Sequence, residues 1–285
     1  MLETAICDEC GSKFYKTSSK MPGLCPECAS VLYGYENCKH VFENGRCIKC
    51  YWDGSKSAYI EASNNSMNPW EEIKLEDYEN HMSLDSVRQL QAMNKIMHEQ
   101  LEAYPVKTAM VLGVAGGNGL EHVRSEKYQV VYGIDINEEY LDAASKRYEQ
   151  SSEVLQFMKM DLLTEADRLP RADLIIANLI VEYIGYSAFK NAVRRVDPEY
   201  VSCVIQVNND DKQWVSDSPY LHVFDGLDSI HHQMEESELA SAMEEIAYTS
   251  VFRSEELLPN GKSLIRMDFR KETEEILQQG AAKFG

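Results

Sequence analysis

The stretch MVLGVAGGNGLEHV, residues 110–123, joins an apolar run to a turn that carries three glycines within four residues. A helical pattern follows the turn, and we expect that helix to reach about Ser125. Since residues without a Cβ let a chain pass close to a bound molecule, the turn indicates a ligand site at the end of a strand. The ligand could be a triphosphate, a dinucleotide or a compound without phosphate.

Apolar runs and helical patterns alternate on both sides of this stretch. The runs predict strands over 108–115, 128–136, 154–162, 172–181 and 200–208. Near-continuous apolar strands separated by helices indicate a parallel sheet that is covered on both faces. Because crossovers between parallel strands are right-handed, this pattern predicts a doubly wound α/β fold.

The phosphate-binding motifs do not match the turn. A triphosphate loop requires GxxxxGK[ST], and neither Lys-Ser nor Lys-Thr follows these glycines. The dinucleotide motif GxGxxG is also broken, since a reading that starts at Gly117 meets His122 where the last glycine belongs.

The turn resembles the motif [D/E]-x-G-x-G-x-G of class I S-adenosylmethionine (SAM)-dependent methyltransferases. Its four positions are here Gly113, Ala115, Gly117 and Gly119, so that a glycine replaces the acid and an alanine replaces the first glycine. The resemblance covers about residues 105–271. It implies SAM as the cofactor and a seven-stranded sheet whose last strand is antiparallel.

Two aspartates stand where this family holds adenosine. Asp135 ends the second strand, where a carboxylate can accept hydrogen bonds from both ribose hydroxyls. The resemblance implies that Asp161, at the end of the third strand, accepts from the adenine amino group, while the Leu162 amide meets the ring. The other expected cofactor contacts are Gly113, Ala115, Gly117, Asn118, Gly119, Ile136 and Asn178.

The end of the chain strengthens the resemblance. A helix is expected over 235–247, and two β-rich runs over 248–271 flank a Pro-Asn-Gly turn. Such a terminal hairpin is typical of this methyltransferase family and not of dinucleotide-binding dehydrogenases.

A helical cap is expected at 68–104, before the first strand. Asn68 and Pro69 form a helix start, and a second start falls at Ser83 or Asp85. Tyr78 and His81 lie between these starts. Ordinary helix packing, with a satisfied histidine, explains both residues; as a functional alternative, the cap would place their phenol and imidazole near the reacting atoms.

Methyl transfer from a sulfonium is an in-line displacement, and a base is needed only if the nucleophile must lose a proton. Ligands of parallel sheets lie beyond the carboxyl ends of the strands, which selects Glu182 and Tyr183 after the fourth strand. The long segment 209–233 is rich in aromatic residues and is expected to cover the substrate, with His231 as a further candidate base. For Glu182 and Tyr183, a helix start and a packed phenol remain alternatives.

Seven of the eight cysteines precede residue 51. In a chain without a charged-then-apolar leader, clustered cysteines indicate metal ligands rather than disulfides. We expect one structural Zn²⁺ at Cys7, Cys10, Cys25 and Cys28, and a second at Cys38, His40, Cys47 and Cys50. The two sets could also interleave. Residues 1–54 therefore resemble tandem zinc ribbons, 55–67 form a linker, and 68–285 form the methyltransferase domain.

The charge of the chain bears on its partners. Residues 1–50 are neutral, whereas the remainder carries 22 basic and 41 acidic residues and hence the whole net charge of −19. Such acidity disfavours nucleic acid, whose binding depends on neutralised phosphates. The expected acceptor is a small molecule or a peptide or protein. The longest apolar run, 174–181, is far shorter than the ~18 residues of a membrane helix, so a cytoplasmic protein is expected.

Two other functions remain open from the sequence. One is an RNA methyltransferase that uses the zinc ribbons to dock RNA. The other is a catalytically inactive SAM-fold protein that serves as a scaffold, which the departures at Gly113 and Ala115 allow. In every case the ribbons could bind a protein partner.

Overall fold

The computed structural model describes residues 3–43, 45–55, 68–208 and 214–272. The chain divides into two compact units, Met1–Met67 and Asn68–Gly285, which are described separately here. From residue 56 on, the expected linker lies outside the described residues. In the part of the chain that is described, no helix combines the length and the apolar character needed to cross a membrane.

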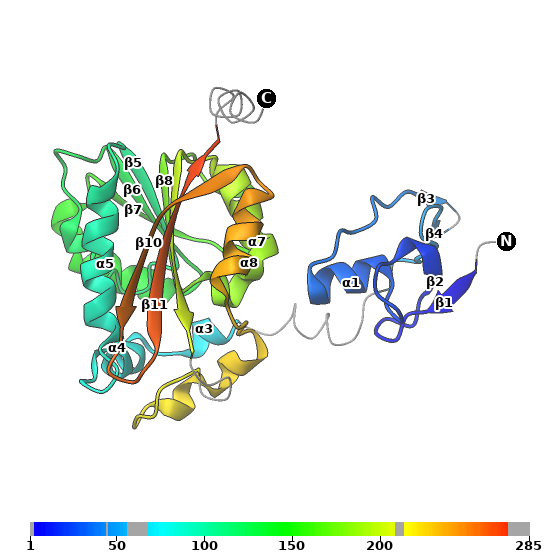
Figure 1. Ribbon diagram of the computed structural model, residues 1–285, viewed down its shortest axis with the longest axis horizontal. Helices are drawn as coiled ribbons and strands as arrows, with labels where there is room; N and C mark the ends of the chain where they lie inside the picture. The colour runs from blue at the N-terminus through cyan, green and yellow to red at the C-terminus, as the bar shows by residue number, and fades with distance from the viewer. Residues whose placement is uncertain (1–2, 44, 56–67, 209–213, 273–285) are drawn as a thin grey trace, which may run out of the picture. The chain divides into compact units, whose positions relative to one another are not determined.

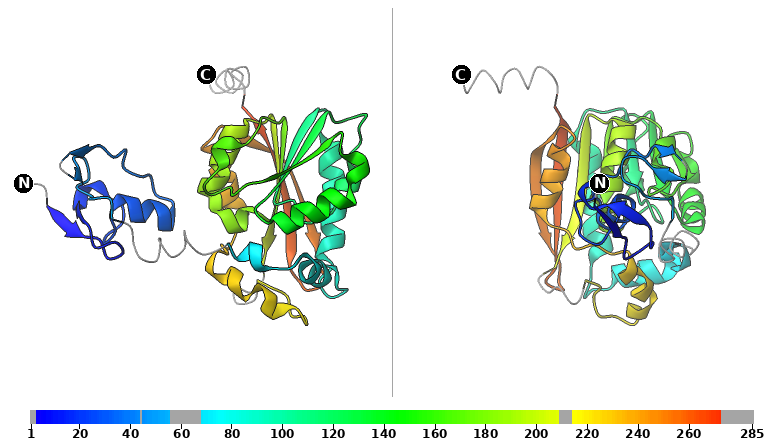
Figure 2. Two further views of the ribbon diagram at one scale, coloured as in Figure 1. Left: turned by 180° about the vertical axis from the view of Figure 1, so that it is seen from behind. Right: turned by 90° about the vertical axis from the view of Figure 1, so that its right-hand side faces the viewer.

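The larger unit contains a seven-stranded sheet with the order β10-β11-β9-β8-β5-β6-β7 (Figures 1 and 2). The five strands from β9 to β7 are parallel, and β11 lies antiparallel between β9 and β10. The predicted sheet with an antiparallel last strand is therefore confirmed. The strands are β5 (Thr108–Leu112), β6 (Val130–Asp135), β7 (Leu155–Lys159), β8 (Leu174–Asn178), β9 (Tyr200–Val207), β10 (Tyr248–Leu257) and β11 (Ser263–Lys271).

Helices cover both faces of this sheet, as the apolar strands predicted (Figure 1). Alternate residues of β5 divide between two cores: Ala109 and Val111 face one, whereas Met110 and Leu112 face the other. The first core is closed by α5 (Gln89–Ala103) and α6 (Glu138–Arg147), and the second by α7 (Val181–Val196) and α8 (Glu236–Glu244). Short 3-10 helices complete the connections: η2 (Leu120–His122), η3 (Glu149–Ser151), η4 (Ala166–Arg168) and η5 (Leu221–Ser229).

The prediction of a helix after the glycine-rich turn is wrong. Only the single 3-10 turn η2 forms there, and turns lead on to β6. Of residues 120–128 only Leu120 and Tyr128 are buried, which is too narrow an apolar stripe for a helix to pack on the sheet. This part of the face is covered by α5, whose Met97 belongs to the same core as Leu120.

The cap begins as predicted but divides differently. In α3 (Pro69–Glu72) the side chain of Asn68 accepts a hydrogen bond from the Trp70 amide at 3.1 Å and caps the helix. Tyr78 and His81, expected between two helices, lie within a further helix, α4 (Leu75–Ser83).

The next helix, α5, starts at Gln89 and not at Ser83 or Asp85. The Val87 and Arg88 amides both donate to the Leu84 carbonyl, so this stretch is a turn. Arg88 then adopts a left-handed conformation with φ 52°, which separates α4 from α5.

The smaller unit contains two short hairpins and one helix. Its elements are β1 (Thr4–Ile6), β2 (Lys13–Tyr15), η1 (Lys16–Ser18), α1 (Pro26–Tyr33), β3 (Phe42–Glu43) and β4 (Arg46–Cys47). The Tyr15 amide donates to the Cys50 carbonyl at 2.8 Å, which joins the two hairpins into one body. Gly45 has φ +76° in the β3–β4 turn, as a hairpin turn requires; its expected neighbour Asn44 lies outside the described residues.

Candidate functional site

One pocket lies at the carboxyl ends of β5, β6, β7 and β8. It encloses about 1140 Å³ of empty space, part of it open to solvent. The segments α3, α4 and η5 gather at this end of the sheet (Figures 1 and 2). Residues of all three line the pocket. Eleven of the predicted site residues line it: Tyr78, His81, Gly113, Ala115, Asp135, Ile136, Asp161, Leu162, Asn178, Glu182 and Tyr183.

The first half of the glycine-rich turn forms one wall. Gly113 has φ +69°, and a Cβ there would lie 3.1 Å from the Ile180 side chain. Ala115 also adopts a left-handed conformation, with φ 46°. Because this conformation favours glycine, the turn keeps the backbone shape of a glycine at a position where the chain has alanine.

The second half of the turn packs against protein instead. A Cβ on Gly117 would lie 2.7 Å from the Tyr148 ring, and one on Gly119 would lie 2.5 Å from Met97. The Asn118 side chain donates to the Leu90 carbonyl at 2.9 Å. None of Gly117, Asn118 and Gly119 lines the pocket, although all three were expected beside the cofactor.

Asp135 links β6 to the turn. Its carboxylate accepts from the Ala115 amide at 2.8 Å and from the Asn137 amide at 2.9 Å. Burial raises the pKa of Asp135, and these backbone amides oppose that shift. Each carboxylate oxygen keeps a further lone pair, so the group can also accept hydrogen bonds from a ligand in the pocket.

Asp161 follows β7 and shapes a turn of its own. Its carboxylate accepts from the Leu163 amide at 2.9 Å and from the Thr164 hydroxyl at 2.8 Å. The side chain therefore holds the loop that carries Leu162 against the pocket.

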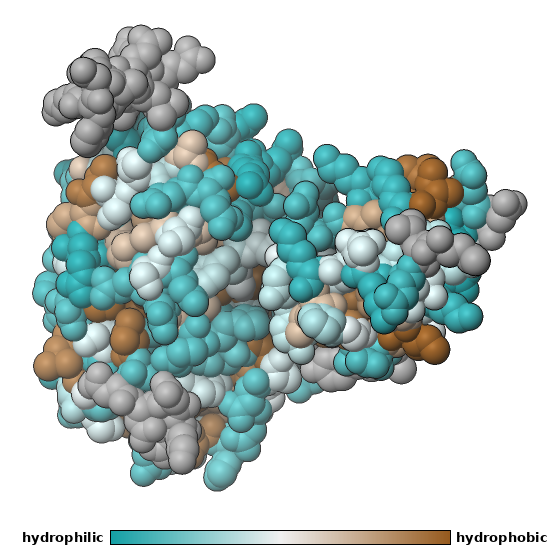
Figure 3. All heavy atoms as spheres, turned by 45° about the vertical axis from the view of Figure 1, so that its right-hand side comes forward, coloured by the Kyte–Doolittle hydropathy of each residue, from teal (hydrophilic) through white to brown (hydrophobic). Residues whose placement is uncertain are grey.

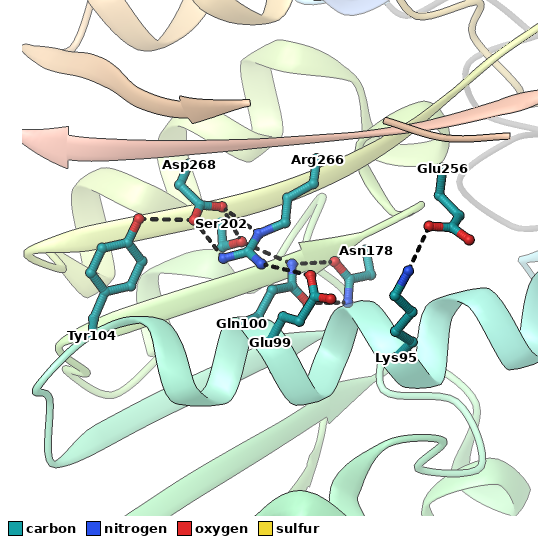
Figure 4. A network of polar contacts seen from close by, with 9 residues as sticks. All are labelled: Lys95, Glu99, Gln100, Tyr104, Asn178, Ser202, Glu256, Arg266 and Asp268. Carbon is teal, nitrogen blue, oxygen red and sulfur yellow. Dashed lines mark hydrogen bonds and ion pairs between the residues drawn. The ribbon is translucent and has the colours of Figure 1, made fainter. Parts of the chain in front are cut away.

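Asn178, at the end of β8, belongs to a polar network between α5 and the sheet (Figure 4). Its side-chain amide exchanges two hydrogen bonds with Gln100, at 2.8 and 2.9 Å. Gln100 also donates to Ser202, which in turn donates to Asp268. The side-chain amide of Asn178 is thus held by protein groups, and Asn178 lines the pocket at the end of β8.

Glu182 is buried in the first turn of α7, with 4% of its surface exposed. One carboxylate oxygen accepts from the Gln206 amide of β9 at 2.6 Å. Burial raises the pKa of Glu182 to about 7, while the Gln206 amide and the charge of Lys262 lower it. A carboxylate whose pKa lies near neutrality can take up or release a proton at working pH.

Several aromatic rings line the same pocket as this carboxylate. Tyr183 makes edge-to-face contacts with Trp70, at 5.0 Å between ring centroids, and with Trp214, at 6.3 Å. Burial raises the pKa of Tyr183 well above its usual value and that of Tyr78 to about 12, so both phenols stay protonated. Phe224 of η5 packs on His81 at 4.8 Å.

The two candidate histidines have different positions. His81 is 2% exposed, lines the pocket and lies 2.7 Å from the Ser218 hydroxyl through Nδ1. His231 stacks on Trp214 with ring centroids 4.0 Å apart and does not line the pocket. Burial lowers the pKa of His231 to about 4, so the ring is neutral.

Several pocket residues were missed from the sequence. They include Trp70, Gln89, Tyr140, Gln206 and Lys262. Trp214 and Phe224, which also line the pocket, belong to the aromatic segment that was expected to cover the substrate. The Trp70 indole nitrogen and the Tyr140 hydroxyl are buried and have no hydrogen-bond partner among the described residues. A residue that ends a parallel strand can be predicted to lie at the ligand site, as Asp135 was. The missed side chains reach the pocket through tertiary packing, which the sequence does not display.

The cysteines of the smaller unit form two four-residue clusters in sequential order. Each brings four ligand atoms within 4.8 Å of one another: Cys7, Cys10, Cys25 and Cys28 in the first, and Cys38, His40, Cys47 and Cys50 in the second. Of the two arrangements left open by the sequence, the interleaved one is not formed.

The geometry of both clusters fits zinc. Tetrahedral Zn²⁺ with Zn–S bonds of about 2.3 Å separates two sulfurs by about 3.8 Å. The Cys10–Cys25 sulfurs are 3.7 Å apart and the Cys38–Cys47 sulfurs 3.9 Å apart. In addition, His40 Nε2 is buried and has no hydrogen-bond partner in the described structure, so this nitrogen is available as a metal ligand.

The fold is similar to that of known methyltransferases. The N-methyltransferase NodS from Bradyrhizobium japonicum WM9, in complex with S-adenosyl-L-homocysteine, is 15% identical over 73% of this chain and 100% of its own, with a TM-score of 0.52. An O-methyltransferase family protein from Burkholderia thailandensis is 15% identical over 70% of this chain and 60% of its own, with a TM-score of 0.51. A geranyl diphosphate methyltransferase in complex with SAM is 10% identical over 65% of this chain and 86% of its own, also with a TM-score of 0.51.

No family model and no curated protein matches the sequence. At these identities the similar structures establish the fold alone: the larger unit has the seven-stranded sheet of class I SAM-dependent methyltransferases.

Proposed function

We propose that the chain transfers a methyl group from SAM to a small acceptor that enters the same pocket. The observation that carries the proposal is that one cavity joins two sets of residues. Asp135, Asp161 and the turn at Gly113 lie toward β5–β7, and Glu182 and Tyr183 lie toward α7. A methyltransferase needs cofactor and acceptor sites that adjoin in this way.

The residues on the β5–β7 side are suited to adenosine. Asp135 would accept hydrogen bonds from the ribose, and Asp161 with Leu162 would border the base. The hydroxyl of Tyr140, which has no partner among the described residues, offers a further hydrogen bond in this pocket. The bound cofactor supplies a methyl group on a sulfonium, which a nucleophile displaces in line.

The residues on the α7 side are suited to the acceptor. Glu182 would hold the proton that an N–H or O–H nucleophile loses, because its carboxylate is buried and its pKa lies near 7. Tyr78, Tyr183 and Trp214 would exclude water and pack against the acceptor. The Glu182 carboxylate would meet the acceptor at a buried position, which supports a small molecule over a folded protein.

We also propose that each Cys cluster holds one structural Zn²⁺. All four ligand positions of each cluster come from the protein, which leaves no open position for chemistry. The smaller unit exposes several apolar side chains (Figure 3), among them Ile6, Val31, Phe42 and Ile48. Together with the neutral charge of residues 1–50, this surface favours a protein rather than RNA as the partner of the unit.

Isothermal titration with SAM and with S-adenosylhomocysteine tests the proposal first, and transfer of tritiated methyl groups into fractionated lysate tests it second. We expect micromolar binding of both compounds and label in the small-molecule fraction. Label in RNA, with RNA binding at low salt, would support the RNA methyltransferase instead. Binding without transfer into any fraction would support the inactive scaffold.

A further inference from the structure

The lysine just before β11 lines the pocket but has no role in the proposed chemistry. Lys262 is 8% exposed and lines the pocket with Glu182, Gln206 and Trp214. It was not among the residues selected from the sequence.

The hairpin turn holds Lys262 in place. The Leu258 amide donates to the Lys262 carbonyl at 2.8 Å, and the Lys262 amide donates to the Asn260 side chain at 3.1 Å. Asn260 also donates to the Ser216 hydroxyl at 2.8 Å, which ties the turn to the segment before η5. The ammonium therefore stands on a fixed backbone, as a recognition group requires.

The ammonium is only partly satisfied. Lys262 Nζ donates to the Trp214 carbonyl, whereas an ammonium has three N–H donors. Within the described residues it forms no ion pair. The contrast is Arg266, a buried cation four residues further on, whose guanidinium makes two hydrogen bonds to Asp268. A buried cation that faces a cavity without a counter-ion provides a binding site for an anion.

The charge of Glu182 does not fill that site. Each of the two groups affects the pKa of the other, but no salt bridge joins them in the described structure. Glu182 Oε1 accepts from the backbone amide of Gln206 instead. Burial lowers the pKa of Lys262 to about 8, so the ammonium is still the main form at neutral pH.

We propose that Lys262 binds an anionic group of the acceptor, and that the acceptor is a small organic acid, a carboxylate with an aromatic body. Tyr183 and Trp214 supply the ring surfaces for that body, and Lys262 lies beside them at the pocket wall. That this ligand is the methyl acceptor rests on the proposed function; that the pocket binds it does not. The negative charge of the bound acid would also offset the charge of Lys262, which lowers the pKa of Glu182. Glu182 would then be the stronger base.

The test uses pairs of probes that differ only in charge, with the full chain and without SAM. Benzoate, 4-hydroxyphenylacetate and indole-3-acetate are each compared with the corresponding carboxamide by ligand-observed NMR and calorimetry. We expect at least one acid to bind about tenfold to a hundredfold more tightly than its amide. Lys262→Met should abolish this preference, and Lys262→Arg should retain part of it.

A matched control is available in Lys127. Its ammonium also donates to a backbone carbonyl, that of Leu101, but it does not line the pocket. Lys127→Met should leave the preference unchanged, and the melting temperature of each variant reports its folding. In Lys262→Met the Trp214 carbonyl keeps its hydrogen bond from Gln206 at 3.0 Å, so the pocket wall should persist.

Two results would overturn the proposal: no acid of the panel binds more tightly than its amide, or the preference survives in Lys262→Met. SAM binding is measured separately on the same samples. If SAM fails to bind while the acid preference holds, the proposed function fails and the lysine site stands.

Discussion

Replacing Asp135 by alanine tests how the pocket holds its cofactor. The wild-type carboxylate accepts from the Ala115 and Asn137 amides at 2.8 and 2.9 Å, and Asp135 lines the pocket, so its remaining lone pairs are available to a ligand. Hydrogen bonds to a charged group contribute about 1.5–3 kcal/mol each. Losing two such bonds to the ribose hydroxyls would weaken SAM binding by about 3–6 kcal/mol, or roughly a hundredfold to ten-thousandfold.

The same substitution leaves two backbone amides without their acceptor, so stability must be measured beside affinity. Asp173 provides the control, because its carboxylate accepts from the Thr108 amide at 3.0 Å at the amino end of the sheet. Asp173→Ala should lower the melting temperature but leave SAM affinity within twofold. Calorimetry of both variants decides the matter. SAM affinity of Asp135→Ala within tenfold of the wild type, in a folded protein, would refute the assignment.

Three further predictions address the base, the metals and the buried network. Glu182→Gln should lower kcat/KM about a hundredfold, and it should remove the rise in rate around pH 7 that deprotonation of Glu182 causes. Lys262 and His81, which also line the pocket, are unchanged in this variant. Since burial raises the pKa of Glu182 from 4.5 to about 7, wild-type stability from this group is complete below pH 4.5 and is lost as pH rises through 7; denaturant titrations of the glutamine variant should lack that loss of up to about 3 kcal/mol. A zinc chelator should unfold the smaller unit, seen as a loss of protected amides there, while the melting transition of the larger unit stays unchanged. Arg266→Met should destabilise the larger unit by about 3–5 kcal/mol because it leaves Asp268 buried and unpaired, and adding Asp268→Leu should recover most of that loss in a double-mutant cycle.

The sequence predicts the sheet well because its strands are apolar on both faces. Ile175 and Ile176 in β8 lie in opposite cores, so the strand appears in the sequence as a continuous apolar run. The Pro-Asn-Gly turn likewise marks the last hairpin. The helix after Gly119 could not be excluded in this way, since the covering of that face by Met97 of α5 is a tertiary effect.

The site residues also fall into two groups, those that the sequence predicts and those that only tertiary packing brings to the pocket. Asp135 and Asp161 follow apolar strands, and the shared edge of a parallel sheet brings them together, so both were predictable. Lys262 and Trp70 come from opposite ends of the larger unit, and no local pattern relates them to the pocket. Gly117 and Gly119 fit a ligand motif, yet their space is taken by Tyr148 and Met97.

The position of β11 has a consequence for biosynthesis. β9 ends at Val207, but the neighbour that completes its hydrogen bonding begins only at Ser263. While the ribosome translates the intervening codons, β9 presents an open edge, and the nascent polypeptide must be kept from pairing with other chains there. A message truncated before these last codons would yield a product with that edge exposed permanently, and we expect such a product to aggregate.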